Sequence, residues 1–292
     1  MRRLGDSVRF GKKSRLAALF VLTLAAAAFL ANMTLNGGAD GLQGIRAAGV
    51  IRIGYAVEAP YAMLGTVGEV TGEAPEIARY VVERLGIARI AWRQVRFEDL
   101  INELRSGMID VAASGMFITP EREERVLFSI PTMEVRPAML MRAGTVKGVD
   151  TYRGLARAGD VRAAVIGGSV EERRLQELGL DERLVVRVPD ALTGVKAVET
   201  GLVDAFLLSE PSLRWAKAQL GLHDLEVLPV QTDPGDVVQS GRPAFAFGPD
   251  DSGLRDEWNK ALRTFLGSSE HCALVARFGL ECSLNSSAGG GL

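Results

Sequence analysis

Histidine and cysteine are nearly absent from this sequence of 292 residues, which contains only two of each. Cys272 and Cys282 have no histidine or carboxylate at a spacing typical of metal ligands, and the histidines are His223 and His271. A Ser–His or Cys–His catalytic arrangement also needs a histidine beside its nucleophile. We therefore expect no metal site, no cofactor and no catalysis of that kind.

Aromatic residues are scarce as well, at 6% of the chain, so an aromatic side chain beside a polar motif is informative. The rest of the composition, 47% hydrophobic and 24% charged, is that of an ordinary soluble protein. The length suffices for one large domain or for two lobes of about 100 residues or more each.

The N-terminus differs from the rest of the chain. Six basic residues precede an uncharged run from Leu16 to Ala31 that is apolar apart from Thr23, and no clean cleavage site follows. Basic residues before roughly 15 apolar ones are typical of a secretory signal, whereas a membrane span needs about 20. We predict that residues 1–36 are a signal peptide or, in the alternative, an N-terminal anchor that tethers the protein through residues 16–31. Either way, the protein is expected to be exported, to the periplasm or the cell surface.

Residues 37–292 have no excess of basic charge. Residues 1–36 hold six of the 34 basic residues and one of the 36 acidic ones, which leaves 28 and 35 and a net charge near −7. Nucleic-acid binding depends on clustered positive charge. A mildly acidic protein gives no reason to expect a nucleic-acid partner.

The two cysteines lie close together near the C-terminus. In an oxidising compartment such a pair can form a disulfide, and Cys272–Cys282 would then join the last helix to the tail. The alternative is two unpaired thiols. The tail itself, residues 283–292, is rich in serine and glycine and is predicted to be disordered.

Strand and helix patterns alternate along two separate blocks of the chain. In the first block we expect strands at 50–55, 90–95 and 109–113 and helices at 74–85 and 97–105. In the second we expect strands at 161–166, 184–188 and 203–208 and helices at 170–178 and 191–200. This rhythm with short connections predicts the α/β class, with a largely parallel sheet in each block.

Two apolar extended runs flank the second block, Pro137–Met141 and Pro243–Phe247. The simplest architecture inserts one lobe into the other, so that two crossing strands form a hinge and a ligand cleft lies between the lobes. Lobe 1 would comprise residues 45–137 plus 243–282, including a C-terminal helix at about 254–266. Lobe 2 would comprise residues 138–242.

Residues 115–131 carry the most specific motif. Thr119-Pro120-Glu121-Arg122 follows a buried strand, and Phe128-Ser129-Ile130-Pro131 comes shortly after it. Together they resemble the T-x-x-R … F-S-x-P signature of family 3 extracellular solute-binding proteins, receptors of polar amino-acid ABC importers. The resemblance covers residues 45–282 and implies a two-lobed, type II periplasmic-binding-protein fold. It also implies a membrane permease as partner and a monomeric receptor.

Within that family the sequence is most similar to receptors for ectoine and hydroxyectoine. The similar segments lie in both predicted lobes: Glu58–Tyr61, Gly68–Glu76, Gly115–Arg122 and Gly167–Glu171. The resemblance implies that Arg122, in the motif with Thr119, binds the ligand carboxylate. A guanidinium suits this role because its fork matches the two carboxylate oxygens. The alternative is a surface arginine paired with a neighbouring glutamate.

The resemblance also implies an aromatic wall around a delocalised cation, made of Tyr61, Phe97 and Phe117. Cation–π attraction is worth about 0.5–2 kcal/mol for each dry face. For Phe97, which opens a helix, core packing is the alternative. Glu58 and Glu171 would accept N–H bonds from the cation, with Gly168 at the mouth of lobe 2. The alternative for each glutamate is a helix-terminal or solvated acid.

One position departs from receptors for α-amino acids, which carry an aspartate for the ligand ammonium after the corresponding lobe-2 strand. Here that position is Ser209, followed by Glu210. A neutral serine is a poor partner for a primary ammonium, which favours a small zwitterion with a delocalised or alkylated cation. The site therefore predicts a non-enzymatic receptor for an ectoine-like solute.

Three alternatives stay open. The first is a receptor for polar amino acids, if Glu210 reaches the ligand. The second is an enzyme on the same fold, similar to cyclohexadienyl or arogenate dehydratases, with Glu58 or Glu171 as general acid or base. The predicted cleft offers no evident histidine or lysine as a partner for that chemistry. The third is a sensor domain.

Overall fold

The computed structural model describes residues 40–144, 149–231 and 240–282. The predicted export segment 1–36 and the predicted disordered tail 283–292 lie outside these residues. Within them, no helix combines the length and the apolar character that crossing a membrane requires.

The first lobe is built on a sheet of five strands in the order β4-β1-β5-β12-β6. β1 pairs in parallel with β4 and β5, and β12 pairs antiparallel with β5 and β6. The strand bounds are β1 Val50–Tyr55, β4 Arg89–Gln94, β5 Val111–Phe117, β6 Leu127–Phe128 and β12 Pro243–Phe247. A small hairpin of β2 (Met63–Leu64) and β3 (Val70–Thr71) stands beside this sheet.

Helices cover both faces of the first sheet. Successive strand residues point to opposite sides, and the apolar residues on each side pack against helices. Val111 and Phe247 pack with Trp258 on one face, and Ala112 and Ala246 pack with Leu100 on the other. The helices of this lobe are α2 Asp40–Ala48, α3 Glu73–Arg84, α4 Leu100–Arg105, α5 Pro120–Glu123, α10 Ser252–Phe265 and α11 Ser269–Ala276, with a 3-10 turn η1 at Phe97–Asp99.

The second lobe repeats the design with the strand order β11-β7-β10-β8-β9. β8 is parallel to β9 and β10, whereas β7 is antiparallel to β10 and β11. The strand bounds are β7 Pro137–Arg142, β8 Ala163–Ile166, β9 Val185–Val188, β10 Ala205–Ser209 and β11 Leu225–Pro229. The helices are α6 Tyr152–Ala158, α7 Val170–Glu177, α8 Ala191–Glu199 and α9 Glu210–Leu220, with a 3-10 turn η2 at Glu182–Leu184. α8 and α9 contribute to the apolar cluster on one face of the sheet, and α6 and α7 to the cluster on the other.

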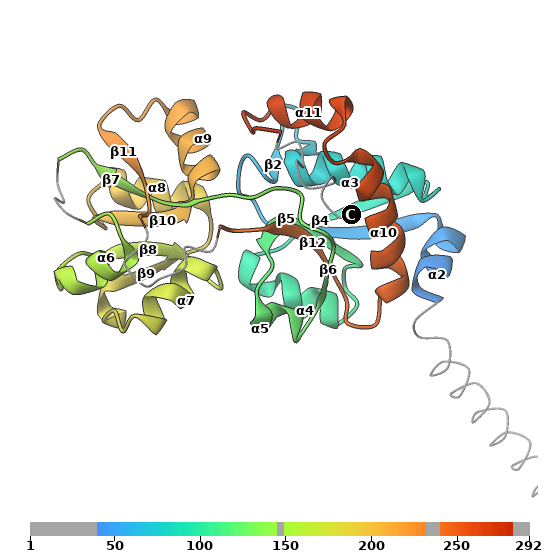
Figure 1. The fold of residues 1–292 in the computed structure, drawn as a ribbon, viewed down its shortest axis with the longest axis horizontal. Coiled ribbons are helices and arrows are strands. Elements are labelled where there is room, and N and C mark those ends of the chain that lie inside the picture. The colour runs from blue at the N-terminus through green and yellow to red at the C-terminus, as the bar shows by residue number, and fades with distance from the viewer. Residues whose placement is uncertain (1–39, 145–148, 232–239, 283–292) are drawn as a thin grey trace, which may run out of the picture.

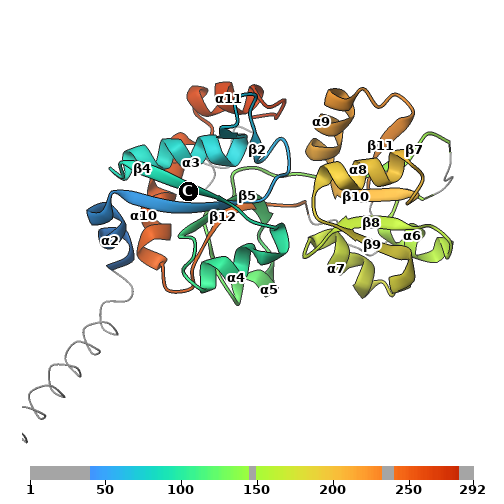
Figure 2. The same ribbon diagram turned by 180° about the vertical axis from the view of Figure 1, so that it is seen from behind.

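The chain crosses between the lobes twice, between β6 and β7 and between β11 and β12 (Figures 1 and 2). The crossing segments are hydrogen-bonded to each other where Val135 and Gly241 exchange both backbone bonds, at 2.9 and 2.8 Å. α10 and α11 then pack against the first lobe. The predicted two-lobed type II fold is therefore confirmed. We keep 45–137 plus 243–282 and 138–242 as the proposed division into lobes.

One expected strand differs in position. The pattern predicts a strand at 109–113, but β5 runs from Val111 to Phe117. Gly115 has φ +63° inside this strand, and the register of β12 shifts between Ala244 and Ala246, opposite it. Pairing with β12 therefore carries the strand through a segment that looks like a turn in the sequence. As a result, Phe117 is the last residue of a central strand.

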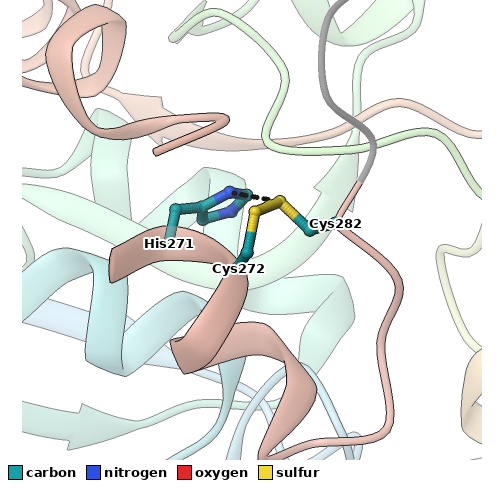
Figure 3. Close-up of side chains that lie close together, drawn as sticks. All are labelled: His271, Cys272 and Cys282. Carbon is teal, nitrogen blue, oxygen red and sulfur yellow. Dashed lines mark hydrogen bonds between the residues drawn. A yellow bond between two sulfur atoms is a disulfide. The ribbon is translucent and has the colours of Figure 1, made fainter. Parts of the chain in front are cut away.

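Cys272 and Cys282 are joined by a disulfide between α11 and the segment that follows it (Figure 3). His271, which directly precedes Cys272 in the sequence, also lies beside Cys282, with Nδ1 3.5 Å from its sulfur. His271 Nδ1 and the two sulfur atoms lie within 4.8 Å of one another, an arrangement that could hold a metal ion if both thiols were free. Because the sulfurs are bonded to each other, neither is a thiolate, the form of cysteine that binds metals.

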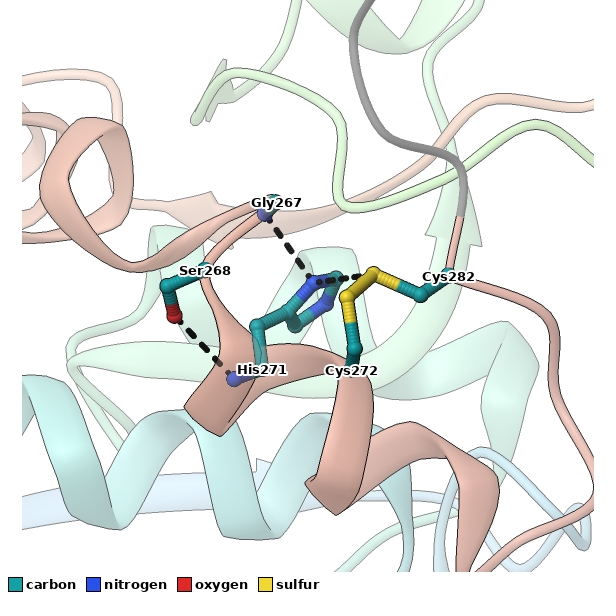
Figure 4. The surroundings of a disulfide bond; sticks show 5 residues. All are labelled: Gly267, Ser268, His271, Cys272 and Cys282. Atoms are coloured by element: carbon teal, nitrogen blue, oxygen red, sulfur yellow. Dashed lines mark hydrogen bonds between the residues drawn. A yellow bond between two sulfur atoms is a disulfide. The ribbon is translucent and has the colours of Figure 1, made fainter.

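Hydrogen bonds also fix His271 in a structural role (Figure 4). The backbone N–H of Gly267 donates to Nδ1 at 3.2 Å, and the backbone N–H of His271 itself donates to Ser268 Oγ at 3.1 Å. The ring is buried, and this burial lowers its pKa. We conclude that His271 packs under the disulfide as a neutral side chain.

Removing the disulfide is expected to destabilise the first lobe. The bridge closes a loop between positions separated by 10 residues. Loop-closure entropy then gives about 2–3 kcal/mol of stabilisation. The double variant Cys272→Ala/Cys282→Ala should lose this amount in guanidinium unfolding followed by circular dichroism. A dithiol reductant should destabilise the wild type to the same extent and leave the variant unchanged. Equal stability of variant and wild type would contradict the expectation.

Candidate functional site

A cavity lies between the two lobes and encloses about 340 Å³, including the space at its open mouth. Residues at the carboxyl ends of β1, β5, β8 and β10 line it, the side of parallel strands at which α/β proteins bind ligands. The first lobe contributes Glu58, Phe97, Gly115, Phe117 and Arg122. The second contributes Ile166, Ser169, Val170, Glu171, Leu208 and Ser209.

Arg122 lies in α5, directly after β5. Thr119 caps this short helix, because its hydroxyl oxygen accepts the backbone N–H of Arg122 at 3.3 Å. The guanidinium donates to the carbonyl of Phe117 at 2.8 Å and, across the cleft, to the carbonyl of Gly168 at 2.9 Å. These bonds use two of its five N–H groups. Burial lowers the pKa of Arg122 to about 10, and Glu171 opposes that shift, so the side chain is cationic at neutral pH.

Gly168 meets Arg122 through its carbonyl, and the peptide group that precedes it is held as well. Its N–H donates to Glu172 Oε2 at 2.7 Å, and Glu172 also forms an ion pair with Arg187. Gly168 has φ +75°, which an L side chain adopts only with strain. The two adjacent glutamates of α7 therefore differ: Glu172 orients the peptide, whereas Glu171 lines the cavity.

Glu58 and Glu171 are the carboxyl groups of the cavity, one from each lobe. Burial raises the pKa of Glu171, and its own backbone, Ser169 and Arg122 oppose the shift. Burial also raises the pKa of Glu58 to about 7, with Ser212 opposing the shift and Glu171 adding to it. Ser212 Oγ donates to Glu58 Oε1 at 2.7 Å from the opposite lobe. Near neutral pH the residues that line the cavity thus offer one cation, Arg122, and two carboxyl groups, Glu58 and Glu171, whose charge depends on the pH.

The three predicted aromatic residues have different surroundings. Phe117 lines the cavity with its ring against the crossing segment, since a Cβ on Gly241 would lie 2.2 Å from it. Phe97 lines the cavity, packs against apolar clusters of both lobes, and lies 5.4 Å from the guanidinium carbon of Arg122. Tyr61 is not among the lining residues: it is 1% exposed, and its ring packs against Gly115.

Further contacts join the lobes around the cavity. Glu121 of α5 forms an ion pair with Arg173 of α7, and both side chains are about half exposed. The backbone of Glu98, in η1, lies directly against Gly168, because a Cβ on that glycine would meet Glu98 Cα at 3.1 Å. The lobes are therefore closed over the cavity, with backbone contact at the edge formed by Gly168.

Six of the nine predicted site residues line the cavity: Glu58, Phe97, Phe117, Arg122, Glu171 and Ser209. Gly168 contacts Arg122, Thr119 caps α5, and Tyr61 lies behind Gly115. Their roles toward a ligand stay predictions. The lining residues that were not predicted are Gly115, Ile166, Ser169, Val170 and Leu208. Sequence reasoning also missed Ser212, which bonds to Glu58 and whose signal is its place three residues after Ser209 in the first turn of α9. At that spacing a side chain returns to the face of the helix occupied by the cap.

The chain matches the model of "bacterial extracellular solute-binding proteins, family 3" over residues 51–281. It is 30% identical over 263 residues to the "probable amino-acid ABC transporter periplasmic-binding protein y4tE" of Sinorhizobium fredii (strain NBRC 101917 / NGR234), which covers 89% of this chain and 86% of that protein. Among solved structures, EhuB in complex with hydroxyectoine superposes with a TM-score of 0.78 at 28% identity. That match covers 84% of this chain and 94% of EhuB.

An enzyme also contains related sequence. The "membrane-bound lytic murein transglycosylase F" of Ectopseudomonas mendocina (strain ymp) is 29% identical over 189 residues, which is 62% of this chain but 36% of that protein. The family match, by contrast, spans nearly all of both lobes. The resemblance that the motifs around Arg122 predict is therefore confirmed, and this chain belongs to family 3 of the bacterial extracellular solute-binding proteins.

Proposed function

We propose that this protein is an exported, non-enzymatic receptor that binds ectoine, hydroxyectoine or a similar small zwitterion and delivers it to the membrane permease of an ABC importer. The observation that carries the proposal is the composition of the interlobe cavity. It combines the buried Arg122 guanidinium with carboxyl groups from both lobes, Glu58 and Glu171. A small molecule with one carboxylate and one cationic group matches that set.

The anionic end of the ligand is assigned to Arg122. A buried carboxylate needs charge-assisted hydrogen bonds, and a guanidinium supplies two parallel ones. Three of its N–H groups remain after the bonds to Phe117 and Gly168. The bond to the Phe117 carbonyl, which lies in the same lobe, also holds the guanidinium in place before the ligand arrives, which reduces the entropy lost on binding.

The cationic end is assigned to Glu58, Glu171 and the ring of Phe117. Ser209, at the end of β10, offers a hydroxyl where α-amino-acid receptors carry an aspartate. The residue is 1% exposed, and its hydroxyl is bonded to that of Ser212. A delocalised cation loses less hydration energy on burial than a primary ammonium and gains from an aromatic face. The likeness to EhuB supports the same assignment.

Isothermal titration calorimetry of residues 37–292 tests the proposal. The panel is ectoine, hydroxyectoine, glycine betaine, glutamine and arginine, and we expect saturable binding of the two ectoines. The amino acids are the second candidate class, which the names of two relatives favour. Tight binding of an amino acid together with no binding of either ectoine would overturn the ectoine assignment and support that class.

An enzymatic role is the third candidate, favoured by one observation. The pKa of Glu58, raised by burial to about 7, suits a general acid or base at neutral pH. Incubation with prephenate or arogenate, followed by chromatography of the aromatic product, tests this role. Product formation that disappears in Glu58→Gln would overturn the assignment as a non-enzymatic receptor.

A further inference from the structure

Ser212 connects the two lobes through a hydrogen bond to Glu58. It lies in the first turn of α9, is 1% exposed, and donates to Glu58 Oε1 at 2.7 Å. Ser209 Oγ is 3.5 Å from the same oxygen but 3.0 Å from Ser212 Oγ. A hydroxyl has one proton to donate. The shorter distance assigns the proton of Ser209 to Ser212, and the proton of Ser212 to Glu58.

The three side chains therefore form a directed chain from Ser209 through Ser212 to Glu58. The backbone N–H of Ser212 also donates to Ser209 Oγ, at 3.4 Å, which orients the first hydroxyl. Hydrogen bonds in such a chain polarise one another and strengthen the last donor. Ser209, which the sequence suggests as a ligand contact, acts here through Ser212.

The charged group that faces Glu58 does not oppose the rise in pKa that burial causes. Glu171 faces it across the cavity and raises its pKa, and the Tyr61 hydroxyl behind it is neutral, since burial raises the pKa of Tyr61. The serine hydroxyls oppose these effects, with that of Ser212 the larger. A donor to a carboxylate favours its charged form. In the closed protein, the bond from Ser212 is therefore the larger of the two serine hydrogen bonds that favour the charged form of Glu58.

We propose that Ser212 is a positioning residue whose bond to Glu58 favours the ionised carboxylate in the closed protein, so that the cavity selects ligands with a cationic end. This inference rests on the proposed function. The bond joins opposite lobes, so closing the lobes and ionising Glu58 support each other. Open lobes would separate Ser212 from Glu58, and the carboxyl group would lose this donor.

The raised pKa of Glu58 determines how ligand affinity should change with pH. With its pKa raised to about 7, Glu58 takes up its proton as the pH falls through that value, so affinity for a cationic end falls over the same range. Ser212→Ala removes the main donor and raises this pKa further. The fall in affinity then begins at a higher pH. We expect a loss of roughly 10- to 100-fold at pH 7, the usual effect of a hydrogen bond to a charged group, which largely recovers at pH 9.

The experiment measures ectoine affinity of residues 37–292 by calorimetry from pH 6 to 9, for the wild type, Ser212→Ala and Ser212→Thr. Threonine keeps the hydroxyl and should restore the wild-type profile. In a Glu58→Gln background, where Glu171 is the carboxyl group of the cavity that still titrates, Ser212→Ala should not change the pH profile. An equal loss of affinity at every pH in Ser212→Ala would overturn the proposal, because it indicates a packing effect only.

A second measurement follows the Glu58 carboxyl group directly. Carbon-13 NMR records its titration in protein saturated with ectoine, or with whichever ligand of the panel the wild type binds, because closed lobes keep Ser212 beside Glu58. We expect a higher midpoint in Ser212→Ala than in the wild type, and an unchanged midpoint would overturn the proposal. If the wild type binds an amino acid and neither ectoine, the proposed ectoine function fails while this titration still decides the role of Ser212.

Discussion

Replacing Arg122 by alanine is expected to weaken ligand binding by roughly 10²- to 10³-fold or more. Arg122 is 8% exposed, so a ligand carboxylate bound to it would be buried as well. Removing one partner of a buried ion pair costs about 3–5 kcal/mol, because the remaining charge is left without compensation. Calorimetric titration of the variant with ectoine, or with whichever ligand the wild type binds, measures the loss.

Two further variants separate the role of the guanidinium from general effects of charge. Arg125→Ala removes a positive charge three residues away, where Arg125 donates to Asn102 at the surface, and should leave the affinity within about twofold. Arg122→Lys keeps the charge without the planar fork and should give an intermediate loss. Arg122 also bonds to the carbonyls of Phe117 and Gly168, so thermal unfolding must accompany each titration. Equal affinities of Arg122→Ala and Arg125→Ala would refute the carboxylate assignment.

Much of the fold is predictable from local patterns. Alternating apolar residues predict β1 at Val50–Tyr55, and the apolar stripe predicts α3 to within one residue at each end. β5 is the exception, because its continuation to Phe117 depends on pairing with β12. The pairing partner of Met116 is Ala244, which is distant in the sequence. Local patterns carry no information on such a contact.

The site is predictable where a residue follows a strand end. Glu58, Arg122 and Ser209 have that position in the sequence and line the cavity in the structure. Adjacent residues are harder to separate. Glu171 and Glu172 are the same residue type and both lie in the first turn of α7. The packing of α7 decides that Glu171 lines the cavity and that Glu172 accepts the N–H of Gly168. The bond between Ser212 and Glu58 can be predicted only from the way the two lobes meet, which no local sequence pattern encodes.

Gly168→Ala is expected to prevent full closure of the lobes and to weaken binding by roughly 5- to 150-fold. The added methyl group would lie 3.1 Å from Glu98 Cα and 3.2 Å from Glu98 Cβ, in the opposite lobe. Overpacking of this kind costs about 1–3 kcal/mol. The penalty applies to the closed form, because open lobes move Glu98 away. Separating the lobes also lengthens the bond between the Gly168 carbonyl and Arg122, so the same change weakens the carboxylate site.

Gly179→Ala is the matched control for this variant. Gly168 precedes α7 and Gly179 follows it, with φ +75° and +72°, so both alanines carry the same backbone strain of about 1–2 kcal/mol. No atom lies within 4 Å of a Cβ at Gly179. Both variants should therefore lose the same amount of thermal stability. Only Gly168→Ala should lose affinity in calorimetry and keep a larger radius of gyration with ligand in small-angle X-ray scattering. Equal affinities would mean that ligand binding does not require the contact between Gly168 and Glu98, and that closure is driven from the Arg122 and Glu58 ends of the cavity alone.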